Sequence, residues 1–235
     1  MDIIILAAGR NERLKGIVPL YHKPLLVVNG KPLIVRMLDI INGWTTGKIV
    51  IVVAPENAKT IVEMTRDCVN QPIDYIIQPY ATGPGNAFIQ AAEICKSKKI
   101  MILCGDNYFQ EEDLRQMFSL ASFDGERFII GTRTIKTKEE AQRFTVITPK
   151  WGILEGLALQ HNDDFWENIG GYRCWVGPLI VPHPMFRDIL NEQSHHVSEL
   201  KIGEHLDKIG LKPTLVDCDC LDIGVPEVVE DATAR

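Results

Sequence analysis

Short, wholly apolar runs recur along the first half of the chain, and a segment with helical periodicity follows each of them. Such runs are typical of strands that are buried on both faces of a parallel sheet. We predict strands at 2–7, 48–54, 73–78 and 99–104. We predict helices at 32–42, 56–69, 84–96 and 111–121. Strands that alternate with helices predict an α/β fold with a doubly wound, mostly parallel central sheet.

The second half of the chain differs from the first in having more strand-like segments. We predict strands at 127–134, 143–149, 152–159, 173–181 and 213–218. We predict helices at 183–192, 198–209 and 225–235, the second of them stopped by Gly210. Because no linker or repeat is recognisable, we interpret residues 1–235 as a single domain. Its first half covers about 1–130, and a small β-rich lobe covers about 131–215.

The order of the elements also predicts where a ligand binds. In open α/β sheets, ligands lie outside the carboxyl ends of the strands. The segments that follow residues 8, 78 and 104 come directly after predicted strands. We therefore expect these three segments to converge on one crevice.

Composition and charge limit the partners. The chain has 235 residues, of which 46% are hydrophobic and 24% are charged, and its formal net charge is −6. An acidic chain is a poor candidate for binding nucleic acid through a broad basic face. The first residues do not resemble a signal peptide, and no run approaches the ~18 apolar residues of a membrane span. We expect a cytoplasmic protein that binds neither membrane nor nucleic acid.

The six cysteines do not predict a metal site. No CxxC pair and no histidine pair at zinc spacing occurs in the chain. Cys218 and Cys220 are separated by one residue, so alternation places both on one face of a strand. We expect buried, reduced thiols.

Candidate chemistry begins where the first strand ends. The loop there holds Gly9, Arg13 and, farther on, Lys23. A glycine directly after a buried strand lets the backbone approach a ligand, and the two cations suit a polyphosphate. A solvated basic loop is the alternative interpretation. The P-loop pattern and the three-glycine dinucleotide pattern are both absent from this stretch, so neither of those sites is expected.

Four stretches resemble, in order, the motifs of the nucleotidyltransferases that activate sugar phosphates. The first is LAAGRNERL followed by KPLL, in which Asn11, Glu12 and His22 depart from the family pattern. The others are IIQPYATGPGNAFIQAA (76–92), MILCGDNYFQEEDL (101–114) and CLDIGVPEVV (220–229). The Gly-Asp-Asn of 101–114 is similar to that of the thymidylyltransferase branch. The resemblance spans nearly the whole chain and implies the family's Rossmann-like fold.

This resemblance implies a magnesium-dependent transferase. An acceptor, expected to be a sugar 1-phosphate, attacks a nucleoside triphosphate, with dTTP or UTP favoured, to give a nucleotide sugar and pyrophosphate. Asp106 and Asp222 would bind Mg²⁺. Arg13 and Lys23 would be the catalytic cations. The residues implied to contact the nucleotide are Leu6, Ala8, Gly9, Gln78, Gly83 and Gly85.

The resemblance also implies how the domain is divided. The half at about 1–130 would bind the nucleotide and the lobe at about 131–215 the acceptor, in a metabolic enzyme of nucleotide-sugar biosynthesis. Small members of the family often form homo-oligomers, so a homo-oligomer is an open expectation.

The acceptor region departs from the family. Family members usually carry a Glu-Lys-Pro triplet where this chain has LALQHNDD (157–164), which contains no lysine. Gln160 and His161 are candidate replacements, and Gly177 matches a family glycine in the next strand. Nearby aromatic residues would either form an acceptor pocket, including one for choline, or pack the sheet or a subunit interface. They are Phe165, Trp166, Tyr172 and Trp175.

Two alternatives to a sugar-phosphate enzyme therefore stay open. One is a cytidylyl- or uridylyltransferase for a non-sugar phosphate such as phosphocholine. The other is a non-catalytic homologue that only binds nucleotide. Acceptor profiling separates the first alternative, and detectable pyrophosphate release excludes the second.

Overall fold

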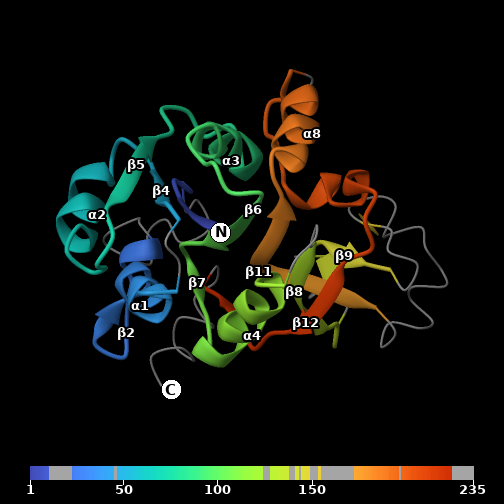
Figure 1. Cartoon of the computed structure of the whole chain (residues 1–235), viewed down its shortest axis with the longest axis horizontal. Coiled ribbons are helices and arrows are strands. Elements are labelled where there is room, and N and C mark those ends of the chain that lie inside the picture. The colour runs from blue at the N-terminus through green and yellow to red at the C-terminus, as the bar shows by residue number, and fades with distance from the viewer. Residues whose placement is uncertain are drawn as a thin grey trace.

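A computed structural model describes residues 1–10, 23–44, 47–123, 128–137, 141–142, 144–148, 153–154, 172–195 and 197–223. Within these ranges one sheet has the strand order β10-β9-β11-β6-β1-β4-β5, with β8 paired to β11 and β12 paired to β8 (Figure 1). Its strands are β1 (Asp2–Ala7), β4 (Ile49–Val53), β5 (Ile73–Ile77), β6 (Lys99–Cys104), β8 (Ile129–Thr134), β9 (Val146–Ile147), β10 (Ile153–Leu154), β11 (Arg173–Pro182) and β12 (Thr214–Asp217). The α-helices are α1 (Leu33–Ile41), α2 (Ala58–Thr65), α3 (Pro84–Ala92), α4 (Glu111–Ala121) and α8 (Met185–Ser194).

The centre of the sheet is parallel. β1 pairs in parallel with β4 and with β6, and β4 pairs in parallel with β5. Each of these strands is followed by a helix, as the alternation of the sequence predicts. The predicted α/β fold with a mostly parallel central sheet is confirmed.

The long strand β11 joins the parallel centre of the sheet to β8 and β9. Its residues from Leu179 to Pro182 pair antiparallel with β6. Its first residues, from Arg173 to Trp175, pair with β8, and Arg173 and Cys174 also pair with β9. The register of the pairing between β11 and β8 shifts between Trp175 and Leu179. This stretch contains Gly177, whose φ is +119°. The β-rich segments of the second half therefore extend the central sheet.

Side chains of successive residues point to opposite faces of the strands and so divide the core into two layers. In β1, Ile3 and Ile5 lie in one layer and Ile4 lies in the other. Residues of α1, α2 and α4 cover the first layer, and residues of α3 and α8 cover the second (Figure 1). The rings of Phe88 and Phe186 meet there with their centroids 5.6 Å apart. Burial on both faces explains why the strand sequences are apolar throughout.

The prediction of a helix at 198–209 is wrong. The structure has two short 3-10 turns there, Gly203–His205 and Asp207–Ile209, and the chain then leaves through Gly210 with φ +70°. The backbone of Leu200 makes its hydrogen bonds with another element: its N–H donates to Thr82 and its carbonyl accepts from Gly85. These long-range bonds hold the start of the segment in a strap across α3. In a helix at 198–209 the carbonyl of Leu200 would instead accept a hydrogen bond from within the helix.

Among the residues that the structure describes, two strand pairs lie outside the main sheet. β2 (Val27–Val28) and β3 (Lys31–Pro32) form a hairpin, and β7 (Asn107–Tyr108) pairs with β13 (Leu221–Asp222). The hairpin turns through Asn29 and Gly30, with φ of 51° and 78°. An Asn-Gly turn between short strands is a strong hairpin signal that the helix and strand predictions above did not use.

The prediction of buried thiols holds for four of the six cysteines, since Cys68 and Cys104 are only partly buried. All six cysteines are present as thiols, and Cys218 and Cys220 are both buried in the core layer that contains α4. Burial raises the pKa of Cys95 and of Cys218 to about 12. Both thiols are therefore protonated at neutral pH and are poor nucleophiles.

Two further expectations concern a terminal helix and a membrane-spanning segment. The terminal helix predicted at 225–235 lies outside the described residues. No helix in the described part of the chain is both long and apolar enough to cross a membrane.

The carboxylate of Asp2 ties three segments together at the amino-terminal edge of the sheet. It accepts backbone N–H bonds from Lys48 at 2.8 Å, from Lys96 at 2.8 Å and from Ser97 at 2.9 Å. The residue is only 3% exposed. Burial alone would raise the pKa of Asp2, but the backbone hydrogen bonds lower it below its usual range.

Replacing Asp2 with asparagine is expected to reduce the free energy of unfolding by about 2–3 kcal/mol, because a buried charged acceptor is lost and N–H groups are left unsatisfied. The folded-state pKa of Asp2 is lowered, so its stabilisation is complete above the unfolded-state pKa of about 3.9 and is lost as pH falls through the folded-state value. Urea unfolding at pH 7 and at pH 3 measures both effects. Asp74→Asn is the control, since Asp74 forms an exposed pair with Lys48. Equal losses of unfolding free energy in the two variants at pH 7 would contradict the role of Asp2 as an anchor of the three segments.

Candidate active site

A cleft of about 520 Å³ lies at the carboxyl ends of the parallel strands. The segments after residues 8, 78 and 104 converge on it, as the sequence predicts. It is lined by Leu6, Ala7, Ala8, Gly9, Arg10, Pro24, Gln78, Ala81, Gly83, Pro84, Ala87, Cys104, Asp106 and Glu199. The lining therefore contains five of the six residues expected to bind the nucleotide and one of the two expected to bind metal.

One end of the cleft is built around Gln78, at the end of β5. This side chain is 5% exposed, and its Nε2 donates to the carbonyl of Gly83 at 3.0 Å. It lies 3.4 Å from Oγ1 of Thr82 as well. Because a carbonyl only accepts, this contact fixes which atom of the amide is nitrogen. No described residue donates to Gln78 Oε1, so this end of the cleft has an available acceptor.

Gly83 begins α3 in a conformation that favours glycine. Its φ is +94° and its ψ is 164°. A Cβ added there would lie 2.5 Å from the carbonyl oxygen of Leu200 and 2.7 Å from its nitrogen. The glycine therefore serves both the turn and the close approach of the strap at 199–200.

Gly85 does not line the cleft. Its N–H donates to the carbonyl of Leu200 at 2.8 Å, and a Cβ there would lie 2.6 Å from the Leu200 side chain. The structure gives Gly85 a packing contact with the strap, and its expected contact with a nucleotide stays a prediction.

The other end of the cleft carries Arg10 and Asp106, with Lys23 beside Asp106. Gly9 and Arg10 follow β1, and both are exposed. Lys23 lies in the short 3-10 turn Lys23–Leu25, and its Nζ is 3.0 Å from Oδ2 of Asp106. The side chains of Lys23 and Asp106 are 13% and 29% exposed, so this ion pair is partly shielded from water.

Asp106 and Asp222 come together although 116 residues separate them in sequence. Asp106 directly follows β6, and Asn107 begins β7. The pairing of β7 with β13 places Asp222 opposite Asn107, and the N–H of Ile223 donates to the carbonyl of Asp106 at 3.2 Å. The backbone of the second carboxylate therefore lies beside the first, while the side chain of Asp222 lies outside the described atoms.

The donor set fits a magnesium ion. The carboxylate of Asp106 faces a cation, Lys23, at the edge of the cleft. Nowhere among the described residues do three or more His, Cys, Asp or Glu side chains form a metal-binding group. Mg²⁺ is usually held by one or two carboxylates together with substrate phosphates and water. Asp106, with the backbone of Asp222 beside it, is compatible with that pattern, and binding of Mg²⁺ by the two carboxylates stays a prediction.

Asn107 fixes the chain next to Asp106. It is buried, and its Nδ2 donates to the carbonyl of Val176 at 2.8 Å and to Sγ of Cys220 at 3.0 Å. Gly177 lies against the same amide, because a Cβ there would overlap Asn107 Nδ2. Gly177 is not among the residues that line the cleft, so its expected contact with the acceptor stays a prediction.

Several expected site residues lie outside the described residues. They are Arg13, Gln160 and His161, together with the aromatic residues Phe165 and Trp166. The two aromatic residues that are described take part in packing: Tyr172 is buried in the core, and Trp175 donates from Nε1 to the carbonyl of Pro178 at 3.3 Å.

The structure adds two charged residues that sequence reasoning did not assign to the site, Arg10 and Glu199. Arg10 stands in the motif LAAGRNERL, where its position in a basic loop was the available signal. Glu199 has no local signal, because only the strap at 199–200 brings it to α3.

Replacing Gly83 with alanine is expected to weaken nucleotide binding about tenfold and to reduce stability by about 1–3 kcal/mol, the cost of a conformation that only glycine adopts easily. The added methyl group displaces Leu200 and opens the cleft wall. Gly43→Ala is the control, since Gly43 also has a positive φ, +78°, but a Cβ there meets nothing within 4 Å. Calorimetry and urea unfolding measure the two effects. If both variants bind nucleotide equally well, Gly83 does not shape the cleft.

Comparisons with known proteins agree with this geometry. The bifunctional protein GlmU of Methanococcus maripaludis is 34% identical over 111 residues, which are 47% of this chain and 26% of that protein. Glucose-1-phosphate thymidylyltransferase of Neisseria gonorrhoeae is 30% identical over 124 residues, 52% of this chain and 43% of that protein. The chain thus spans less than half the length of either relative.

The fold is also that of a solved enzyme. The inositol-1-phosphate CTP transferase from T. maritima superposes with a TM-score of 0.72 at 17% identity, over 99% of this chain and 94% of that one. A family comparison matches residues 2–160, which include Gln78, Gly83 and Asp106. The chain belongs to the nucleotidyl transferase family.

Proposed function

We propose that this protein is a magnesium-dependent enzyme that transfers a nucleoside monophosphate group from a nucleoside triphosphate to a sugar 1-phosphate, with release of pyrophosphate. The observation that carries the proposal is the single cleft in which Gln78 and Gly83 lie at one end and Gly9 and Asp106 at the other. Membership of the nucleotidyl transferase family supports the same reaction class.

The proposed reaction depends more on positioning the phosphates and neutralising their charge than on acid–base catalysis. The acceptor phosphate is ionised at neutral pH, and one of its oxygens attacks the α-phosphorus in line as the bond to pyrophosphate breaks. Gly9 offers backbone N–H groups to the phosphates. Lys23 holds the acceptor and donor phosphates together, and Arg13 neutralises charge on the leaving pyrophosphate. Asp106 and Asp222 would hold Mg²⁺, which would supply further charge neutralisation when bound.

The identity of the donor nucleotide is a more specific part of the proposal. The expectation of dTTP or UTP comes from the resemblance of Gly105-Asp106-Asn107 to the thymidylyltransferase branch. In the structure these residues lie at the carboxylate end of the cleft, away from Gln78 at the end of β5. They are therefore a weak guide to the base, and the side chains at the Gln78 end decide its identity.

A second acceptor class is favoured by one specific observation. Residues 157–164 contain no lysine to hold a sugar phosphate. A non-sugar phosphate, such as phosphocholine, needs fewer hydroxyl contacts from that region. The solved CTP transferase of similar fold acts on inositol 1-phosphate by its name, which supports such acceptors within this fold.

Pyrophosphate release tests both candidates. The assay contains Mg²⁺, each common nucleoside triphosphate in turn, and a panel of sugar 1-phosphates with phosphocholine and inositol 1-phosphate. A signal with one sugar 1-phosphate supports the main proposal, and a signal confined to a non-sugar phosphate supports the second. Triphosphate binding without release from any pair would overturn both and leave a protein that only binds nucleotide.

A further inference from the structure

The buried side chain of Asn57 has no part in the proposed reaction, yet it lies between the ends of β1 and β4. Asn57 stands between β4 and α2 in the chain and is 1% exposed. Its Nδ2 donates to the carbonyl of Ala7 at 3.0 Å, and its Oδ1 accepts from the N–H of Ala54 at 2.9 Å. Because a carbonyl only accepts and an N–H only donates, these two partners fix the orientation of the amide.

The amide of Asn57 replaces a backbone hydrogen bond between β1 and β4. The two strands pair in parallel up to Ala7. The N–H of Ile3 donates to the carbonyl of Lys48, and this pattern repeats at every second residue of β1. Its next bond would run from the N–H of Ala54 to the carbonyl of Ala7, but both groups bond to Asn57 instead. The strands therefore part at this point with their backbone groups satisfied.

This contact sets the direction of the peptide bond between Ala7 and Ala8. The C=O and N–H of a trans peptide point in opposite directions, and β4 and β6 flank β1 on opposite sides. A carbonyl held by Asn57 on the β4 side therefore directs the N–H of Ala8 to the β6 side, where Gly105 and Asp106 follow the strand. Ala8 lines the cleft, and none of the described residues accepts from its N–H. This donor is available to a ligand on the side of the cleft where Asp106 lies.

We propose that Asn57 is a positioning residue that holds the peptide bond between Ala7 and Ala8 so that the N–H of Ala8 is presented to the nucleotide. The inference rests on the proposed function, because it needs the cleft to bind a nucleoside triphosphate. Asn57 is not among the residues that line the cleft, so it acts through the backbone of β1. Asparagine is favoured where a helix begins, but this side chain makes no capping hydrogen bond to α2. Its amide serves the end of β1 instead.

Asn57→Ser tests the proposal, because serine removes the donor to Ala7 and is itself favoured at the start of a helix. Calorimetry uses the full chain with Mg²⁺ and each of ATP, CTP, GTP, UTP and dTTP. For the nucleotide that binds, the variant is expected to raise the Kd about tenfold, on the scale of one hydrogen bond. In initial rates of pyrophosphate release, the KM for that nucleotide should rise while the KM for the acceptor stays the same. A merely structural role would lower the free energy of unfolding in urea and leave the Kd of the folded protein unchanged.

Asn42→Ser is the matched control, because the amide of Asn42 also bonds the backbone of another segment. Its Oδ1 accepts from the N–H of Asn70 at 3.2 Å, outside the cleft, so the Kd is expected to stay at the wild-type value.

Asn57→Asp is a second variant that keeps an acceptor for Ala54 but has no donor when ionised. It is expected to match Asn57→Ser, and it decides the test if the serine variant does not fold. Nucleotide binding that is as tight in the folded Asn57 variants as in the wild type would overturn the role of Asn57 alone. Absence of nucleotide binding by the wild type would overturn the proposed function as well, so the two failures are distinguishable.

Discussion

Replacing Asp106 with asparagine will reduce the rate of pyrophosphate release by about a thousandfold, the scale of losing an interaction made with the charge that develops in the transition state. Asparagine keeps the size of the side chain and removes its charge. It therefore removes the carboxylate that follows β6 and that faces Lys23 at 3.0 Å. The measurement is kcat with the nucleotide and acceptor pair identified by the assay above, at saturating Mg²⁺.

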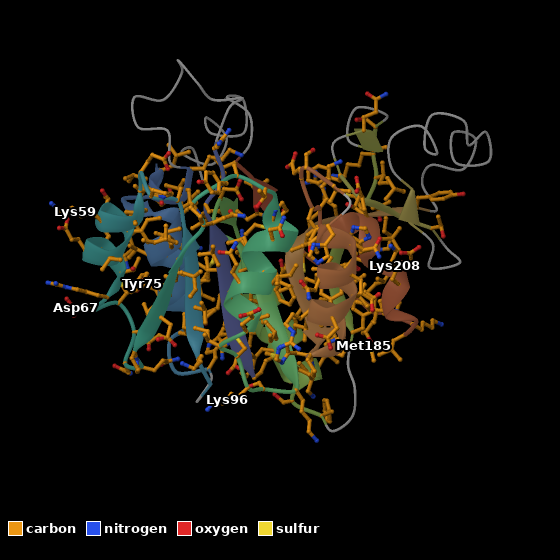
Figure 2. The ribbon with its side chains drawn as sticks, turned by 90° about the horizontal axis from the view of Figure 1, so that it is seen from above. Lys59, Asp67, Tyr75, Lys96, Met185 and Lys208 are labelled. Atoms are coloured by element: carbon orange, nitrogen blue, oxygen red, sulfur yellow. The ribbon has the colours of Figure 1, made fainter. Side chains whose placement is uncertain are left out.

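Asp67→Asn is the matched control for Asp106. The side chain of Asp67 is 85% exposed beside α2, on the outer flank of the molecule where Figure 2 labels it. This variant is expected to retain wild-type turnover. A second measurement separates loss of activity from loss of fold: Asp106→Asn should unfold in urea close to the wild type. A folded Asp106→Asn protein with wild-type turnover would exclude Asp106 from the active site.

Replacing Lys23 with glutamine will lower kcat by about 10²–10³-fold, because a cation that offsets charge on the reacting phosphates is lost. The side chain is only 13% exposed and lies against Asp106, so its charge acts in a partly shielded environment. The effect should fall on kcat more than on KM if Lys23 acts mainly in the transition state. Initial rates over a range of both substrates measure that division.

Lys59→Gln is the matched control for Lys23. Its side chain is 88% exposed on α2 and is labelled in Figure 2 on the same flank as Asp67. It should leave both kinetic parameters unchanged. A Lys23→Gln variant that raises KM and leaves kcat unchanged would show that Lys23 contributes to substrate binding but not to the chemical step.

The fold was largely predictable because the strands of the central sheet are buried on both faces. Residues such as Ile3, Ile4 and Ile5 then have to be apolar in succession, which marks β1 in the sequence itself. The segment 198–209 could not be predicted in the same way. It has enough apolar residues for a helix, but its first backbone groups bond to Thr82 and Gly85, which are more than a hundred residues away.

In the candidate site too, some features were predictable from the sequence and others were not. Motifs next to strand ends identified Gly9, Gln78, Gly83 and Asp106, since a parallel sheet brings the carboxyl ends of its strands to one edge. No motif could show that Gln78 directs its amide nitrogen to the carbonyl of Gly83. That orientation depends on where the backbone of Gly83 lies.

The sequence by itself therefore determined the sheet, the edge at which the cleft lies and the family, because burial, periodicity and motif order are local properties of the chain. The tertiary structure decided which groups line the cleft together. It paired β7 with β13 and so brought Asp222 to Asp106, and it laid the strap with Glu199 across the start of α3. Both contacts join residues more than a hundred positions apart, and only the packing of distant segments against one sheet brings them together.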